Sequence, residues 1–197
     1  MNAQDSIKLQ TGDALIIVDV QNDFLPGGSL AVAYGDEVVP VLSRYIHAFK
    51  ENGLPIFATR DWHPSNHCSF KAQGGPWPPH CIRSTKGAEF AAGLQLPEDA
   101  VIISKATSQE PDAYSGFDGT ELHDRLQILG INRLFTGGLA TDYCVLSTVK
   151  DALSLGYGVY LLEDAIRAVN VHPDDGKKAE EEMIRLGAKT IKVEHIA

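Results

Sequence analysis

The sequence is poor in the residues and patterns that mark several classes of protein. It has only three cysteines, too few for the disulfide framework of a small secreted domain. Seventeen Lys and Arg stand against 26 Asp and Glu, a net charge of −9, and no basic cluster marks a nucleic-acid site. Apolar runs such as Ala14–Val18 fall far short of the roughly 20 residues of a membrane-spanning helix. Residues 1–11 lack the layout of a secretory signal. We therefore expect a cytoplasmic protein with neither nucleic-acid nor membrane partners.

The remaining composition is that of an ordinary globular protein. Hydrophobic residues make up 44% and charged residues 22%, enough for one sizeable hydrophobic core. Domains usually run to about 100–200 residues, so we expect residues 1–197 to form a single domain. No internal repeat or low-complexity linker divides the sequence. The oligomeric state stays open, with a homo-oligomer as one alternative.

Short apolar runs alternate with helical patterns along the chain. The run 14–20 is apolar except for Asp19, which is typical of a strand buried on both faces. This alternation predicts a three-layer α/β/α sandwich around a six-stranded parallel sheet. The expected strands are 14–20, 55–60, 100–105, 133–138, 159–162 and 190–194, and the expected helices are 36–52, 120–129, 143–155 and 172–187.

One long segment breaks the alternation. Residues 61–97 show no clean periodicity, and glycine and proline gather at 74–79. Loops of this length inside a compact domain usually carry function. We therefore interpret residues 61–97 as a lid or binding loop.

Reactive side chains follow four of the predicted strands. Asp19 ends the first strand, Asp61 and His63 follow the second, Lys105 ends the third, and Cys144 lies a few residues past the fourth. Ligands of open parallel sheets bind beyond the carboxyl ends of the strands. We therefore expect these groups to converge at one edge of the sheet.

Cys144 is the candidate nucleophile. We expect it in the first turn of a helix, where free N–H groups and the helix dipole favour the thiolate. The alternative is a packed thiol, but Gly137 and Gly138 permit a turn that binds an anion. In the functional interpretation Asp19 accepts the thiol proton and Lys105 favours both negative charges. The alternative for these two residues is a plain buried ion pair.

A second set of residues has metal-binding chemistry. Asp61 and His63 are two residues apart, which directs both side chains to one side of an extended chain, and His67 and His80 follow on the same loop. Oxygen and nitrogen ligands of this kind suit Zn²⁺, Mn²⁺ or Fe²⁺. The alternatives are solvated loop histidines, or a Cys/His zinc site that uses Cys68 and Cys81 without the usual four-ligand spacing.

Six stretches of the sequence are together specific enough to compare with known families. They are ALIIVDVQNDF (14–24), PGGSL (26–30), RDWHP (60–64), WPPHC (77–81), YSGF (114–117) and GLATDYCV (138–145). As a set they resemble the nicotinamidase/pyrazinamidase proteins, which belong to the isochorismatase-like cysteine hydrolases. The resemblance covers nearly the whole chain. It implies a sheet in which the strands lie in the order 3-2-1-4-5-6.

The resemblance also implies roles for individual residues. His67 is a further candidate for the metal site, and a cis peptide is implied between Leu139 and Ala140. For Phe24, ordinary aromatic packing is the alternative to substrate binding. The implied set is Asp19, Lys105 and Cys144 as catalytic triad, Asp61, His63 and His80 as metal ligands, the N–H groups of Ala140 and Cys144 as oxyanion hole, and Phe24, Trp77 and Tyr114 around the pyridine ring.

The implied activity is hydrolysis of nicotinamide to nicotinate and ammonia in NAD salvage, and of pyrazinamide to pyrazinoate. One divalent ion per chain, Zn²⁺ ahead of Fe²⁺ and Mn²⁺, would hold the ring nitrogen and orient the amide towards Cys144. Isochorismatase and N-carbamoyl amide hydrolases are rival interpretations, which share the triad but not the Asp-x-His…His set. A non-catalytic metal-binding α/β domain is another, but it would need no triad.

Overall fold

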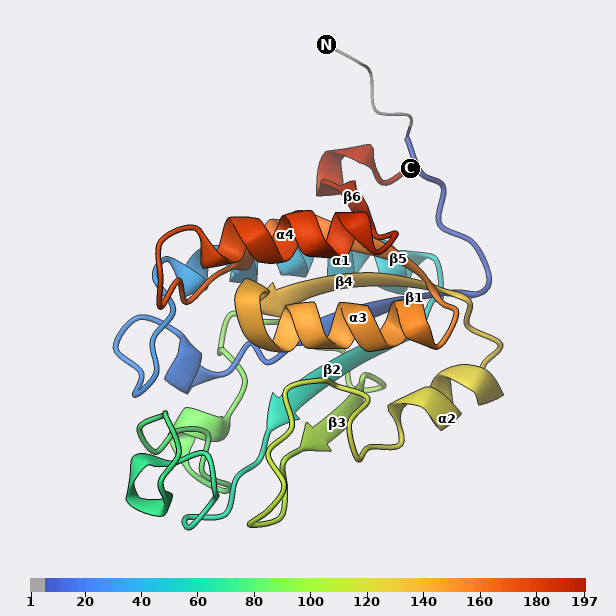
Figure 1. Cartoon of the computed structure of the whole chain (residues 1–197). Helices are drawn as coiled ribbons and strands as arrows, with labels where there is room; N and C mark the ends of the chain where they lie inside the picture. Colours follow the sequence, from blue (N-terminus) through green and yellow to red (C-terminus); the bar gives the residue numbers. More distant parts are fainter. Residues whose placement is uncertain (1–5) are drawn as a thin grey trace.

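Six strands form one parallel sheet in the order β3-β2-β1-β4-β5-β6 (Figure 1). The computed structural model describes residues 6–197, so part of the segment predicted to lack a secretory signal lies outside the described residues. The predicted fold class and strand order are both confirmed. The strands are β1 (Asp13–Val18), β2 (Ile56–Asp61), β3 (Val101–Lys105), β4 (Arg133–Leu139), β5 (Gly158–Arg167) and β6 (Lys189–Ile191).

Helices cover both faces of this sheet, as Figure 1 shows. One face packs against α1 (Val38–Glu51), and the other against α2 (Leu122–Ile128), α3 (Leu146–Ser154) and α4 (Asp175–Arg185). Within the described part of the chain, no helix has the length and apolar composition needed to cross a membrane.

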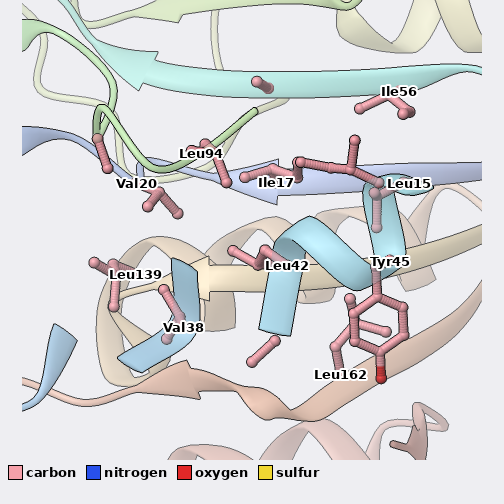
Figure 2. Close-up of a cluster of buried hydrophobic side chains, with 14 of the residues drawn as sticks. Leu15, Ile17, Val20, Val38, Leu42, Tyr45, Ile56, Leu94, Leu139 and Leu162 are labelled. Carbon is pink, nitrogen blue, oxygen red and sulfur yellow. The ribbon is translucent and has the colours of Figure 1, made fainter. Parts of the chain in front are cut away.

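The strand β1 is buried on both faces because its side chains alternate between two hydrophobic clusters. Leu15 and Ile17 point to the face that α1 covers, where they meet Leu42 and Tyr45 (Figure 2). Ile16 and its neighbours in the strand belong to the opposite cluster. A central strand with two covered faces explains why the sequence here is a continuous apolar run.

Several predicted strand ends differ from the observed ones. The first strand stops at Val18 because Asp19 has a positive φ of +48°, which leaves the extended region. The fifth strand runs on to Arg167, where it pairs with the end of β4 after a register shift. The sixth is shorter than predicted, because the chain turns into a 3₁₀ helix at Val193–His195.

The long segment predicted as a loop contains short 3₁₀ turns at Lys71–Gln73 and Lys86–Ala88. Isolated bridges join His63 to Ile82 and Phe70 to Trp77, so distant parts of the segment are tied to one another. In Figure 1 it lies beyond the arrowheads of β2 and β3. The segment therefore covers the sheet edge where the reactive residues were predicted.

Candidate active site

The carboxyl ends of four strands bring the predicted reactive groups together. Lys105 Nζ lies 3.0 Å from Asp19 Oδ2 and 3.5 Å from Cys144 Sγ. The same ammonium group contacts Asp61 Oδ1. All four side chains are buried, and Cys144, the most accessible, is 6% exposed. A carboxylate, an ammonium and a thiol from three distant stretches of sequence thus share one enclosed site.

The turn after β1 aims the Asp19 carboxylate. The Asp19 N–H donates to the Thr59 carbonyl at 3.2 Å, and Thr59 Oγ1 donates to Asp19 Oδ1 at 2.6 Å. Asp19 Oδ2 forms an ion pair with Lys105 Nζ at 3.0 Å. One carboxylate oxygen is therefore held by Thr59, and the other faces the ammonium group that also contacts Cys144 Sγ.

Cys144 lies in a π-helical turn, Thr141–Val145, that leads into α3. The prediction that Cys144 lies in the first turn of a helix is confirmed, and the structure adds that this turn is π-helical. The Ala140 carbonyl accepts the N–H groups of Tyr143 and Val145, both at 3.1 Å, so neither hydrogen bond uses the N–H of Cys144. The wider π turn places the sulfur at the sheet edge while α3 continues in regular geometry.

Glycine at position 138 lets the strand carrying this turn pass close to β1. A Cβ atom on Gly138 would lie 2.1 Å from the Val18 carbonyl oxygen, and the residue has a φ of +125°. Both facts exclude other residues there. The implied cis peptide between Leu139 and Ala140 is present.

Burial and mutual proximity set the charges of the site. Burial raises the pKa of the Cys144 thiol well above its ordinary value, although Lys105 opposes this effect. Burial also raises the pKa of Asp19, against the opposing influence of Lys105 and Thr59. Burial by itself lowers the pKa of Lys105, but the carboxylates of Asp19 and Asp61 outweigh it and hold this pKa well above the usual value. A raised thiol pKa favours the protonated sulfur, so its reaction requires a base, the role that the sequence-based interpretation gives to Asp19.

Three ligand atoms of Asp61, His63 and His80 lie within 4.8 Å of one another. The Nε2 atoms of His63 and His80 are 3.6 Å and 4.0 Å from Asp61 Oδ2. Each Nδ1 faces a backbone carbonyl, that of Ala106 at 3.2 Å and that of Pro78 at 2.8 Å. Because a carbonyl only accepts hydrogen bonds, Nδ1 carries the proton and Nε2 is left to bind a metal. The donor set and its tautomers fit a divalent ion.

The charges of these groups also suit a metal ligand set. Burial favours the neutral acid of Asp61, but Lys105 and His63 outweigh it and hold the pKa of that carboxyl below its usual range. Burial lowers the pKa of His80, which favours the neutral ring. Metal ligands must be deprotonated, so both shifts favour binding.

The remaining candidate metal ligands, His67, Cys68 and Cys81, lie outside the Asp61–His63–His80 set. The His67 ring stacks on His63 with the centroids 4.0 Å apart, and its Nδ1 pairs with Ser69 Oγ at 2.7 Å. Its Nε2 is buried and has no hydrogen-bond partner among the described residues. Cys68 and Cys81 are free, and neither belongs to a metal-competent cluster in the described part of the chain. The alternative of a Cys/His zinc site is therefore wrong.

An aromatic pocket opens beside the buried groups, with about 440 Å³ of empty space that is partly open to solvent. Phe24, Trp77 and Tyr114 line it together with Cys144, and Trp77 Nε1 donates to Tyr114 Oη at 3.0 Å. Sequence reasoning missed Tyr143, whose ring meets Trp77 edge-on with centroids 5.1 Å apart. Tyr143 directly precedes Cys144 in the GLATDYCV stretch, and this position could have indicated that it lies at the pocket. The pocket therefore offers flat apolar walls to a small planar ring.

The chain is similar to several known proteins. Residues 13–195 match the isochorismatase domain family. The nicotinamidase of Escherichia coli (strain K12) is 40% identical over 196 residues, covering 89% of this chain and 92% of that protein. The crystal structure of the pyrazinamidase of Pyrococcus horikoshii in complex with zinc is 52% identical, with a TM-score of 0.88 over 92% of this chain and 99% of that one. PnC1 from L. infantum, solved in complex with nicotinate, is 37% identical, with a TM-score of 0.91 over 98% of both chains. The chain therefore belongs to the isochorismatase domain family.

Proposed function

We propose that the protein is a metal-containing cysteine amidohydrolase that converts nicotinamide to nicotinate and ammonia. One observation carries the proposal: Lys105 Nζ contacts the Asp19 carboxylate and the Cys144 thiol within 3.5 Å, at the floor of an aromatic pocket. The nicotinamidase and pyrazinamidase relatives support the same chemistry. Pyrazinamide, a planar heteroaromatic amide of similar size, would be a second substrate.

The pocket explains how such a substrate is held. Phe24, Trp77 and Tyr114 give the ring apolar walls, as the family resemblance implied. When bound to Asp61, His63 and His80, a divalent ion supplies a fixed coordination position for the ring nitrogen. Zn²⁺ fits these donors, with Fe²⁺ and Mn²⁺ as alternatives. A ring held in this way would place its carboxamide against the sulfur. The entropy cost of orienting the two reacting groups would then be met when the substrate binds and not in the chemical step.

The first half of the reaction forms a thioester on Cys144. Asp19 takes the thiol proton through Oδ2, the oxygen that faces Lys105, and the resulting thiolate attacks the amide carbon. Lys105 stays cationic beside both groups and stabilises the negative charge that moves from carboxylate to sulfur. We assign the oxyanion hole to the N–H groups of Ala140 and Cys144, both of which line the pocket.

The second half releases the products. The protonated Asp19 gives its proton to the departing nitrogen, so the C–N bond breaks and ammonia leaves. The same carboxylate, again ionised, removes a proton from water as the water attacks the thioester carbon. The C–S bond then breaks, the sulfur regains a proton, and nicotinate leaves. One buried carboxylate therefore acts as base and acid in turn.

The rival activities are less well supported by the site. N-carbamoyl amide hydrolases and isochorismatase share the triad, but they do not need the Asp61–His63–His80 set that is assembled here. A non-catalytic metal-binding domain would not need a buried ammonium beside a thiol. We further propose that the enzyme works in the cytoplasm in NAD salvage and without nucleic acid, which its free thiols and net charge of −9 support.

Ammonia release from nicotinamide tests the proposal. The wild-type protein should release ammonia, and Cys144→Ala should show no turnover because the nucleophile is gone. Cys68→Ala is the matched control, since Cys68 is a free cysteine on the loop and does not line the pocket, and it should keep the wild-type rate. The proposal fails if the metal-loaded wild-type protein is as silent as Cys144→Ala.

A further inference from the structure

We propose that Asp23 is a positioning residue that sets the affinity of the Asp61–His63–His80 set for its metal ion. Asp23 lies in the short 3₁₀ turn Asn22–Phe24 that follows β1, and it does not line the pocket. The inference rests on the proposed function for the identity of the metal site. It adds a residue that neither touches the substrate nor ligates the ion.

The Asp23 carboxylate holds the backbone next to one metal ligand. Its Oδ2 accepts the N–H of Cys81 at 2.7 Å, and Cys81 directly follows His80. The Cys81 carbonyl in turn accepts the N–H of His63 at 3.0 Å. Cys81 has a φ of +45°, a conformation that a non-glycine residue rarely adopts without support. One carboxylate oxygen therefore fixes the residue that joins the two histidine ligands.

The surroundings of Asp23 leave the carboxylate little room to move. A Cβ atom on Gly87 would lie 2.1 Å from Asp23 Oδ2, and one on Gly28 would lie 2.3 Å from the Asp23 carbonyl oxygen. Neither glycine has a positive φ, so space and not backbone conformation requires them. The other carboxylate oxygen accepts the N–H of Ser29 at 3.3 Å. Gly87 and Ser29 thus contact the carboxylate itself, and Gly28 packs against the backbone of the same residue.

The same short segment also holds the third ligand. The Gln21 side chain donates to the Asp61 carbonyl and accepts the Asp61 N–H, both at 2.8 Å. Its Nε2 also donates to the Ala88 carbonyl at 2.9 Å. Residues 21–23 therefore tie the backbones around all three ligands to the end of β1. Ligands that are fixed in this way lose less conformational entropy when the ion binds, so removing one tie should weaken binding.

Zinc affinity, measured without substrate, tests the proposal. The metal-free protein is titrated with Zn²⁺ in competition with a chromophoric chelator, for wild type, Asp23→Ala and Asp36→Ala. Asp36 is the matched control, an exposed aspartate between β1 and α1 whose loss changes the net charge equally. We expect Asp23→Ala to bind Zn²⁺ about 10- to 100-fold more weakly and Asp36→Ala to bind as wild type.

A second variant separates the hydrogen bond from folding. Asp23→Asn keeps one oxygen that can accept the Cys81 N–H, so its affinity should lie between those of wild type and Asp23→Ala. If circular dichroism shows that Asp23→Ala does not fold, the weaker binding expected of Asp23→Asn carries the test. The proposal is overturned if folded Asp23→Ala binds Zn²⁺ with wild-type affinity. If Asp23→Ala does not fold, wild-type affinity in Asp23→Asn overturns it. An equal loss of Zn²⁺ affinity in Asp36→Ala also overturns it. If wild type binds Zn²⁺ but releases no ammonia, the proposed function fails, while this measurement still decides the role of Asp23.

Discussion

Lys105 Nζ lies 3.0 Å from Asp19 Oδ2 although β2 separates the strands that carry the two residues. Neighbouring strands are about 4.8 Å apart, so the lysine side chain has to span about 10 Å of sheet width. It passes the end of β2 and contacts Asp61 there. One buried ammonium thus pairs with the candidate base and with a candidate metal ligand, which links the two halves of the site electrostatically.

The hydroxyl group of Thr59 should contribute to the rate through Asp19. Thr59→Val keeps the shape of the side chain but removes the 2.6 Å hydrogen bond to Asp19 Oδ1. With one oxygen no longer held, the carboxylate loses the orientation that proton transfer from Cys144 requires. We expect kcat/KM for nicotinamide to fall about ten-fold, equivalent to about 1.4 kcal/mol.

Thr59→Ser is the control for this prediction, because it keeps the hydroxyl group and loses only a methyl group. It should recover most of the wild-type kcat/KM, and thermal unfolding should show that both variants are folded. Equal rates in Thr59→Val and wild type would show that the hydrogen bond does not orient the base.

Removal of the metal ion should abolish turnover and lower thermal stability together. In the proposed site the ion binds Asp61, His63 and His80 of the folded protein only, so it would stabilise that state by about 2.7 kcal/mol when its free concentration is 100 times Kd. Dialysis against a chelator should remove activity and lower Tm, and added Zn²⁺ should restore both. Full turnover in protein shown by elemental analysis to be metal-free would contradict the assignment.

The hydrogen bond between Trp77 and Tyr114 should affect substrate binding more than chemistry. Tyr114→Phe removes the acceptor of the Trp77 N–H, 3.0 Å away, so the indole is held less firmly in the pocket wall. We expect KM to rise about three- to ten-fold with kcat nearly unchanged. Tyr34→Phe, at a residue that is 70% exposed, is the control and should change neither parameter. A fall in kcat at constant KM would instead place Tyr114 in the chemistry.

Much of the fold could be read from local patterns. The apolar run that became β1 and the helical spacing of Leu42, Tyr45 and Phe49 both follow from burial that repeats along one element. Because parallel strands end at one edge, the meeting of Asp19, Lys105 and Cys144 followed from their places after predicted strands. The strand order came instead from the family resemblance, which also chose His80 over His67 among the candidate metal ligands of the loop.

Other features depend on contacts that no local pattern encodes. The hydrogen bond from Cys81 to Asp23 joins residues 58 positions apart, and the Gln21 side chain reaches Asp61 across 40 positions. The rise in the pKa of the Cys144 thiol comes from burial in the assembled site, which the position at a helix end alone does not reveal.

Tyr45 should make the protein sensitive to alkaline pH. The residue is fully buried on α1, and its hydroxyl group donates to Asp164 Oδ1 at 2.9 Å. Burial, together with the Asp164 carboxylate, raises the pKa of Tyr45 well above its ordinary value of about 10. Above about pH 10, Tyr45 of the unfolded chain loses its phenol proton while Tyr45 of the folded protein keeps it. The folded state then binds more protons, so stability must fall as the pH rises.

Tyr45→Phe isolates this contribution. Near neutral pH the variant should be less stable than wild type by about 1.5–3 kcal/mol, because it lacks a hydrogen bond to a charged acceptor. Above about pH 10 the wild-type free energy of unfolding should fall faster, by up to about 1.4 kcal/mol per pH unit, and the two curves should converge. The other tyrosines titrate in both proteins, so they cancel in the difference. Urea unfolding of wild type and Tyr45→Phe from neutral to alkaline pH measures the difference between their free energies of unfolding. Two curves that stay parallel would show that Tyr45 does not cause the loss of stability at alkaline pH.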